Sequence, residues 1–142
     1  MLREILDVTQ DDPGSQRRWF HDDDFDLFVR EANGELSAFE LCYGFDSNER
    51  ALVWARGRGY FHDGEASQDF IGAGLADGGP IEADPVIARF TLSAGGLPRT
   101  LRVALEERLR EFALQRADGA ARRRRFRRAG WQSPKQDRAR VA

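Results

Sequence analysis

Two short stretches of the sequence contain its only histidines, and the residues around them are similar. WFHD occupies residues 19–22 and YFHD occupies residues 60–63, so each histidine follows two aromatic residues and precedes an aspartate. Two imidazoles and a carboxylate can hold iron, zinc or manganese, and such an ion can activate water or polarise a substrate. One hypothesis is therefore a metal-dependent enzyme whose ligands are His21, His62, Asp22 and Asp63.

The alternative is that both stretches are polar turns at the ends of strands, where Asp and His are ordinary residues. Successive side chains of a strand point to opposite faces of the sheet, so His21 and Asp22 reach one ion only across a turn or a bulge. We favour surface turns on this ground. The chain also lacks a recognisable catalytic set such as a Gly-x-Ser-x-Gly elbow, so we expect no cofactor and lean against an enzyme.

The dipeptide Asn33-Gly34 predicts a β-hairpin between two apolar runs. Both central residues of a type I′ turn need a positive φ, which Asn and Gly tolerate. A two-residue turn at this position predicts that Phe28 pairs with Phe39 and that Leu27 pairs with Glu40. Glu40 would then lie on an apolar face, where a carboxylate needs a partner or a raised pKa, and such groups cluster at functional sites.

For Glu40 the ordinary alternatives are an ion pair with Arg56 or a position at the edge of the sheet, and we favour these. In the predicted register, the core face of the hairpin holds Phe25, Leu27, Val29, Leu36, Ala38 and Cys42. The second face holds Phe28, Phe39, Leu41 and Tyr43 among polar residues. This second face is too apolar for a plain solvent surface, so a helix or a second subunit should cover it. The candidate binding residues are Phe28, Phe39 and Tyr43 on this second face and Glu40 on the opposite face.

Further strands are predicted on both sides of the hairpin. Residues 2–8 form a first strand, and residues 51–62 form another that Gly57 and Gly59 interrupt with a bulge or a close backbone approach. VIARFTL at residues 86–92 is expected as one more strand. The glycine-rich stretch before it lacks the Gly-Lys-Ser/Thr ending of a phosphate-binding loop, which argues against nucleotide binding.

An amphipathic helix is predicted at residues 98–116, followed by a stop at Asp118-Gly119. Apolar residues recur at spacings of three and four at Leu101, Leu105, Leu109 and Phe112. The expected fold is thus α+β: an antiparallel meander sheet of four to five strands packed on one C-terminal amphipathic helix, with a basic disordered tail. Residues 1–118 would form the domain and residues 119–142 the flexible tail.

The end of the chain is strongly basic, in contrast to the rest. Residues 1–118 carry thirteen Arg and twenty-three acidic residues, whereas residues 119–142 carry eight Arg and one Lys against one acid. Arginines interleaved with aromatic residues suit phosphate contacts and base stacking. An anionic partner is therefore expected, either nucleic acid or the acidic body of the protein itself. The candidate binding residues are Arg123, Arg124 and Arg125.

The composition sets further limits. A chain of 142 residues with 41% hydrophobic and 32% charged residues suits one domain with a modest core. No apolar run approaches the roughly 18 residues of a membrane span, and the N-terminal residues do not resemble a secretory signal. Cys42 is the only cysteine, which excludes an intrachain disulfide and a thiolate zinc cluster. We expect a cytoplasmic protein that does not associate with membranes.

Four short segments of the first half resemble a family of short bacterial proteins of unknown function. RRWF at residues 17–20, FDL at 25–27, LCY at 41–43 and ERALVW at 49–54 carry the resemblance. The resemblance covers about residues 17–65 and implies that the meander is the common part and the basic tail an addition. Taken together, the sequence predicts a non-catalytic binding or interaction module that self-associates through the second hairpin face.

Overall fold

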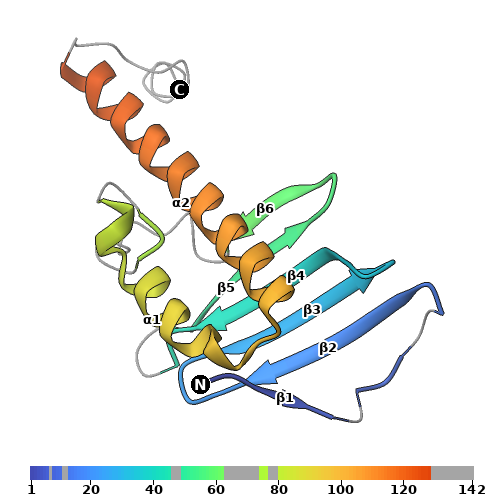
Figure 1. Cartoon of the computed structure of the whole chain (residues 1–142). Helices are drawn as coiled ribbons and strands as arrows, with labels where there is room; N and C mark the ends of the chain where they lie inside the picture. The colour runs from blue at the N-terminus through green and yellow to red at the C-terminus, as the bar shows by residue number, and fades with distance from the viewer. Residues whose placement is uncertain (7, 11–12, 46–48, 63–73, 77–79, 129–142) are drawn as a thin grey trace.

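The structure is one antiparallel sheet with helices on one of its faces (Figure 1). The computed structural model describes residues 1–142 except 7, 11–12, 46–48, 63–73, 77–79 and 129–142, and for residues 119–128 it describes the backbone. The strands are β1 (Arg3–Ile5), β2 (Ser15–His21), β3 (Asp26–Ala32), β4 (Glu35–Tyr43), β5 (Arg50–Ala55) and β6 (Gly59–His62). The α-helices are α1 (Pro85–Ser93) and α2 (Arg99–Arg128), and short 3-10 turns occupy Ile81–Ala83 and Ala94–Gly96.

The strands form a simple meander. Their order in the sheet is β1-β2-β3-β4-β5-β6, and each pairs antiparallel with the next. The α+β class and the meander are therefore confirmed, with six strands among the described residues where four to five were predicted. The count differs partly because residues 51–62 form two strands. Gly57 and Gly59 have φ of 79° and 81°, so they make the turn between β5 and β6 instead of a bulge within one strand.

The prediction of a strand at residues 86–92 is wrong, because this segment lies in α1. Asp84 caps the helix by accepting hydrogen bonds from the backbone N–H groups of Val86 and Ile87 at 3.0 and 3.1 Å. Pro85 follows at the first helical position, where its fixed φ suits a helix start. A short apolar run fits a strand and a buried helix equally well, and here the capping residues decide.

The amphipathic helix is longer than predicted. It begins near the expected residue but continues through Asp118-Gly119 to Arg128, so residues 119–128 are helical in their backbone. A glycine costs a helix about 1 kcal/mol relative to alanine, and the alanines and arginines that follow are good helix formers. Figure 1 shows that α2 crosses the same sheet face as α1 and projects past the edge of the sheet. No helix in the described ranges is long and apolar enough to cross a membrane.

The hairpin turn was predicted correctly, but its register was not. Asn33 and Gly34 have φ of 55° and 78°, as a type I′ turn requires. A β-bulge then shifts the pairing, since Glu31 pairs with Leu36 and Arg30 with Ala38, which leaves Ser37 as the extra residue. Beyond the bulge, every β4 residue lies opposite a different partner and on the other face from the prediction.

The corrected register changes which residues are buried. Phe28 pairs with Glu40, and Val29 pairs with Phe39. The buried face of the hairpin therefore holds Leu27, Val29, Leu36, Phe39, Leu41 and Tyr43. Phe28, Ala38, Glu40 and Cys42 lie on the other face. The helices pack on the buried face, where Phe25 meets Phe90 of α1 edge to face, with ring centroids 5.7 Å apart.

The remaining core agrees with the predicted apolar residues. Eight buried residues were expected from the sequence: Phe25, Leu27, Val29 and Leu36 on the predicted core face of the hairpin, and Leu101, Leu105, Leu109 and Phe112 on the predicted helix. Trp19 is only half-buried, because it lies on the face away from the helices.

Candidate functional site

The sheet face opposite the two helices, called the open face below, has an apolar middle. Strand pairing places five side chains in one row across the sheet, from β2 to β6: Trp19, Phe28, Glu40, Val53 and Phe61. Trp19 stacks on Phe28, with ring centroids 5.7 Å apart and planes at 16°. Phe28 is 41% exposed and Phe61 is 69% exposed. Four of the five residues are apolar, and solvent reaches them.

The two ends of the open face differ in charge. Arg17 and Arg30 pair at one end of β2 and β3, and both are exposed. At the other end His21 pairs with Asp26, and the Nδ1 atom of the histidine lies 2.7 Å from the Oδ1 atom of the aspartate. The same oxygen accepts a hydrogen bond from Trp19 Nε1 at 3.0 Å. Arg3 of β1 pairs with His21 at this end, so along the strands the face runs from basic, through apolar, to an end of mixed charge that holds Asp26.

A shallow depression of about 510 Å³ lies on this face. Its charged lining includes Arg17, Arg30 and Glu40, and its apolar lining consists of Val8, Trp19, Phe28, Val29, Ala38, Phe39 and Val53. Phe28 and Glu40 were predicted as binding residues, and both lie here. Phe39 and Tyr43, predicted with them, lie on the buried face.

Glu40 is exposed, and so the prediction of a carboxylate on the core face is wrong. Arg56, proposed as its partner, pairs instead with Glu35 at 3.2 Å. Cys42 Sγ lies 3.9 Å from Glu40 Oε1. Burial, followed by the charges of Glu40 and Asp26, raises the pKa of the Cys42 thiol to about 11. The thiol is therefore protonated at neutral pH, unlike the thiolate of a nucleophilic cysteine.

The structure does not bring the two histidines together. His21 is exposed on the open face, whereas His62 is 3% exposed on the helix face. Four strand spacings separate β2 from β6, which is roughly 19 Å. The two imidazoles therefore cannot share one ion in this arrangement. Within the described part of the chain, no group of three His, Cys, Asp or Glu side chains is placed to hold a metal, and Asp63 lies outside it.

Asp22 shapes a turn, as the alternative interpretation expected. Its Oδ1 atom accepts hydrogen bonds from the backbone N–H groups of Asp24 and Phe25, both at 2.8 Å. Burial alone would raise the pKa of this carboxyl. The hydrogen bonds from Ser93 and from the two backbone groups outweigh burial, so the pKa lies below its usual value.

Tyr43 and His62 form a buried polar pair on the helix face. The Tyr43 hydroxyl lies 2.5 Å from His62 Nε2, and the two rings stack at 11°. Arg116 Nη1 of α2 lies 3.4 Å from the other ring nitrogen of His62. Burial raises the pKa of Tyr43 to about 12, against the opposing charges of Arg50 and Arg116. Buried polar groups need such partners, and the pair ties β4 and β6 to α2.

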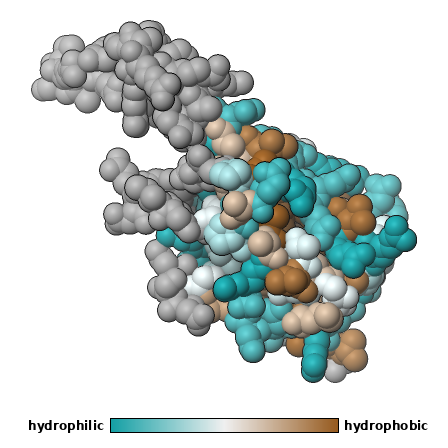
Figure 2. All heavy atoms as spheres, turned by 60° about the vertical axis from the view of Figure 1, so that its left-hand side comes forward, coloured by the Kyte–Doolittle hydropathy of each residue, from teal (hydrophilic) through white to brown (hydrophobic). Residues whose placement is uncertain are grey.

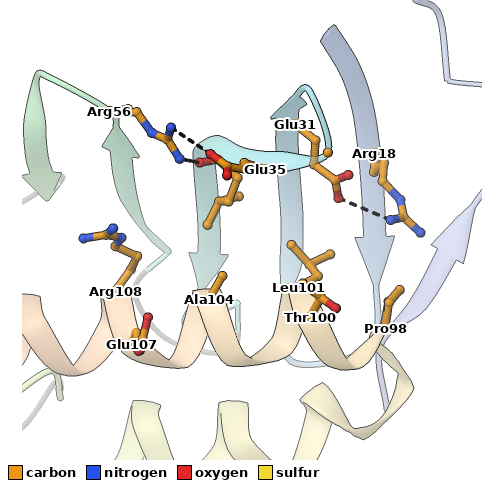
Figure 3. Close-up of a pocket in the computed structure, with 12 residues that line it drawn as sticks. Arg18, Glu31, Glu35, Arg56, Pro98, Thr100, Leu101, Ala104, Glu107 and Arg108 are labelled. Carbon is orange, nitrogen blue, oxygen red and sulfur yellow. Dashed lines mark hydrogen bonds and ion pairs between the residues drawn. The ribbon is translucent and has the colours of Figure 1, made fainter.

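A second cavity, on the helix side, was not anticipated from the sequence. It has a volume of about 420 Å³ and lies between the β3–β4 end of the sheet and the first half of α2; this space is called the cleft below (Figure 3). Its charged lining consists of Arg18, Glu31, Glu35, Arg56, Glu107 and Arg108. No local motif marks these residues, because they come from β2, β3, β4, α2 and the β5–β6 turn.

Two ion pairs border the cleft on its sheet side (Figure 3). Arg18 pairs with Glu31 at 3.3 Å and donates two further hydrogen bonds to Glu4, at 2.9 and 2.7 Å. Arg56 pairs with Glu35 at 3.2 Å and also donates to the carbonyl of Leu36 at 2.9 Å. The Arg18–Glu31 pair is mostly buried, whereas the side chains of Arg56 and Glu35 are 58% and 71% exposed.

On the helical side of the molecule, the described residues expose small separate apolar patches. Figure 2 views it from the left-hand side of Figure 1 and shows brown apolar patches separated by teal hydrophilic atoms. Leu92 of α1 and Val103 and Leu114 of α2 are the large exposed apolar residues of these helices among the residues described. The predicted anion-binding residues Arg123, Arg124 and Arg125 have their backbone in the last part of α2, and their side chains lie outside the description.

Comparison of this chain with protein-family models, with curated proteins and with solved structures finds no match. The resemblance of residues 17–65 to a family of short bacterial proteins therefore stays a prediction.

Proposed function

We propose that this protein is a non-catalytic interaction module that self-associates through the open face. The observation that carries the proposal is the middle row of that face, in which Trp19, Phe28, Val53 and Phe61 line up on the side away from the helices. Contiguous exposed apolar groups rimmed by charge are typical of protein interaction sites. Burying such a row against its own copy removes apolar area from water, which is the main driving force for association.

The charges of the open face favour a second copy as the partner. Consider two copies that pack face to face about a two-fold axis that lies between the sheets and perpendicular to their strands. The strands of one copy then run in the opposite direction to those of the other. Arg30, at the basic end of one face, then meets Asp26, at the mixed-charge end of the other. Each contact occurs twice, because a two-fold interface is self-complementary. Complementary charge fixes the orientation and suppresses wrong partners.

The size of the face fits a reversible dimer. Six strands at about 4.8 Å spacing and about six residues at 3.3 Å each span a flat area of roughly 500 Å². A typical stable interface buries roughly 800 Å² of accessible surface per partner, and the accessible surface of a face with projecting side chains exceeds its flat area. We therefore expect a dimer that dissociates on dilution.

Two charge-reversal variants and their mixture test this arrangement. In a homodimer, Arg30→Asp places a carboxylate opposite each Asp26, and Asp26→Arg places a guanidinium group opposite each Arg30. The dissociation constant of each variant alone should exceed that of the wild type by about tenfold or more. In an equimolar mixture, both contacts again join opposite charges, so a heterodimer should form in sedimentation equilibrium. If both variants associate like the wild type, the open face is not the interface. If they dissociate but their mixture does not associate, the two-fold arrangement is wrong.

A second candidate is association with nucleic acid through the Arg-rich segment. The supporting observation is that α2 continues to Arg128 and carries the backbone of this segment past the sheet (Figure 1). Removal of residues 119–142 should weaken binding to single-stranded RNA, and the loss should be larger at low salt than at moderate salt. Binding that is unchanged by the truncation would eliminate this candidate.

A further inference from the structure

The cleft on the helix side contains equal numbers of basic and acidic side chains. Three arginines and three glutamates line it, together with an apolar part made by Leu36, Pro98, Leu101 and Ala104. Figure 3 shows the charged side chains of the strands on one side of the space and those of α2 on the other. Its volume of about 420 Å³ falls within the roughly 300–1,000 Å³ of small-molecule sites.

We propose that this cleft binds a small zwitterion with an aliphatic part, such as a free amino acid or a dipeptide. A zwitterion presents one ammonium and one carboxylate, and the cleft offers carboxylates and guanidinium groups within one small space. A ligand of a single charge would meet repulsion from half of the charged lining. The balance of charges therefore selects the class of ligand.

The Glu35–Arg56 pair is the part of the lining that can exchange partners. Both side chains are more than half exposed, and ion pairs at such positions are weak because water screens them. The ligand ammonium can replace Arg56 at Glu35, and the ligand carboxylate can bind the guanidinium that is released. Arg56 stays near the cleft during the exchange, since it also donates to the Leu36 carbonyl.

Arg108 supplies a second, fixed guanidinium on the helix side. It lies over the Trp54 ring, with 4.6 Å between its central carbon and the ring centroid, and it pairs with Glu111 at 3.0 Å. Planar stacking holds a guanidinium in one orientation. The neighbouring Glu107 also lines the cleft. Each wall thus carries both signs of charge.

The other ion pair of the cleft, between Arg18 and Glu31, is held in place by further hydrogen bonds. Arg18 is shared between Glu31 and Glu4, and hydrogen bonds to both carboxylates raise its pKa above the usual value. The side chains of Arg18 and Glu31 are only 19% and 16% exposed. Replacing this pair would break several hydrogen bonds at once, so the Glu35–Arg56 end is where the ligand charges bind.

The apolar part of the cleft provides the place for an aliphatic side chain. Leu36 and Leu101 are buried beneath it, and Ala104 is half-buried on the side of α2 that faces the sheet (Figure 3). Because alanine is small, this turn of the helix leaves space that a larger residue would fill. Ala104 is therefore the position at which a substitution blocks the cleft most directly.

The test uses the full chain and follows backbone amide signals by NMR during titration with leucine and leucyl-leucine. Two control ligands each lack one charge: 4-methylpentanoate has no ammonium, and 3-methylbutylamine has no carboxylate. The zwitterions should shift the signals of Leu36, Ala104 and Arg108 in a saturable way. The dissociation constant of each control ligand should be higher by about tenfold or more. Equal binding of a zwitterion and a control, or no shift by leucine or leucyl-leucine, would overturn the proposal.

Substitutions locate the binding. Ala104→Leu should abolish the shifts, whereas Val103→Leu, on the exposed neighbouring position of α2, should leave them unchanged. If Ala104→Leu does not fold, Glu35→Gln and Arg56→Gln provide the test, because both positions are exposed. Each of these variants removes one of the two charges that the ligand would contact, so each should weaken binding. Wild-type affinity in Ala104→Leu, or in both charge variants, would contradict the assignment. The cleft and the open face lie on opposite sides of the sheet, so this result is independent of self-association.

Discussion

Trp19 and Phe28 lie side by side on the open face, with ring centroids 5.7 Å apart and nearly parallel planes. The indole N–H also donates a hydrogen bond to Asp26 at 3.0 Å, so the stack is fixed in place at the end of the face that holds this carboxylate. A rigid aromatic pair loses little conformational entropy when it enters an interface.

Phe61→Glu should weaken self-association without lowering stability. Phe61 is 69% exposed in the middle row, so a charge there would have to be buried in the dimer. The dissociation constant should rise by about tenfold or more, and the unfolding free energy should change by less than about 0.5 kcal/mol. Leu92→Glu is the matched control, since Leu92 is 78% exposed on α1. Equal effects of the two substitutions on the dissociation constant would contradict the prediction.

Glu40→Gln should have the opposite effect and strengthen the dimer. In the proposed two-fold arrangement, the middle row of one copy faces the middle row of the other, so the two Glu40 carboxylates approach each other. Like charges that face across an interface oppose binding. Sedimentation equilibrium should show a lower dissociation constant for the variant. A weaker dimer would mean that Glu40 has a favourable partner in the interface and that the strands are aligned differently.

The reactivity of Cys42 reports on both its environment and the interface. Because its thiol pKa is raised to about 11, reaction with a disulfide reagent should be slow at neutral pH and should accelerate as the pH rises towards that value. Cys42 lies on the open face, so dimerisation should slow the reaction further at high protein concentration. A rate constant that is independent of protein concentration would show that Cys42 is not covered.

Asp84→Ala should destabilise the protein by about 1–2 kcal/mol, the usual effect of losing an N-cap. Its side chain caps α1 through two backbone N–H groups and also accepts a hydrogen bond from the backbone N–H of Ala76. Urea unfolding measures the loss. Asp84→Asn keeps one acceptor oxygen for the cap but loses the bond from Ala76, so its stability should lie between those of Asp84→Ala and the wild type. Glu82→Ala in the preceding turn is the control. Full stability of Asp84→Ala would show that the cap is not needed.

Stability should fall at acid pH through Asp22 and Glu4. Both carboxyls have pKa values below their usual ones in the folded protein, Asp22 because of its hydrogen bonds and Glu4 because of Arg18. A carboxyl with a lowered folded pKa stabilises the fold above its unfolded pKa, and this stabilisation is lost as the pH falls through the folded value. The unfolding free energy should therefore decrease below about pH 4. In Asp22→Asn the decrease should be smaller, and an unchanged acid profile would exclude a role for Asp22.

Local sequence signals predicted the elements that depend on a few adjacent residues. Asn33-Gly34 predicted the turn, and the leucine spacing predicted α2, because both depend on short-range geometry. Asp84-Pro85 was also a helix-start signal, and giving it more weight than the apolar run that follows would have identified α1.

The register and the cleft depend on contacts between distant residues. The bulge at Ser37 is supported by a hydrogen bond from its hydroxyl to the Arg30 carbonyl and by another from the Arg56 N–H to the Ser37 carbonyl. Arg56 belongs to another hairpin, so the sequence of β3 and β4 alone does not reveal the shift. The favoured interpretation of both Phe-His-Asp stretches as surface turns holds at Asp22 but is wrong for His62, which is buried on the helix face. Only the complete register determines that the two histidines lie on opposite faces of the sheet.

The molar mass of the wild-type protein as a function of concentration tests the central claim most directly. Sedimentation equilibrium should give a mass near the monomer value of 16.1 kDa at high dilution and a rise towards twice that value as the concentration increases. The Phe61→Glu variant should remain near the monomer mass over the same range. A wild-type protein that stays monomeric at the highest concentration, or a Phe61→Glu variant that dimerises equally well, would contradict self-association through the open face.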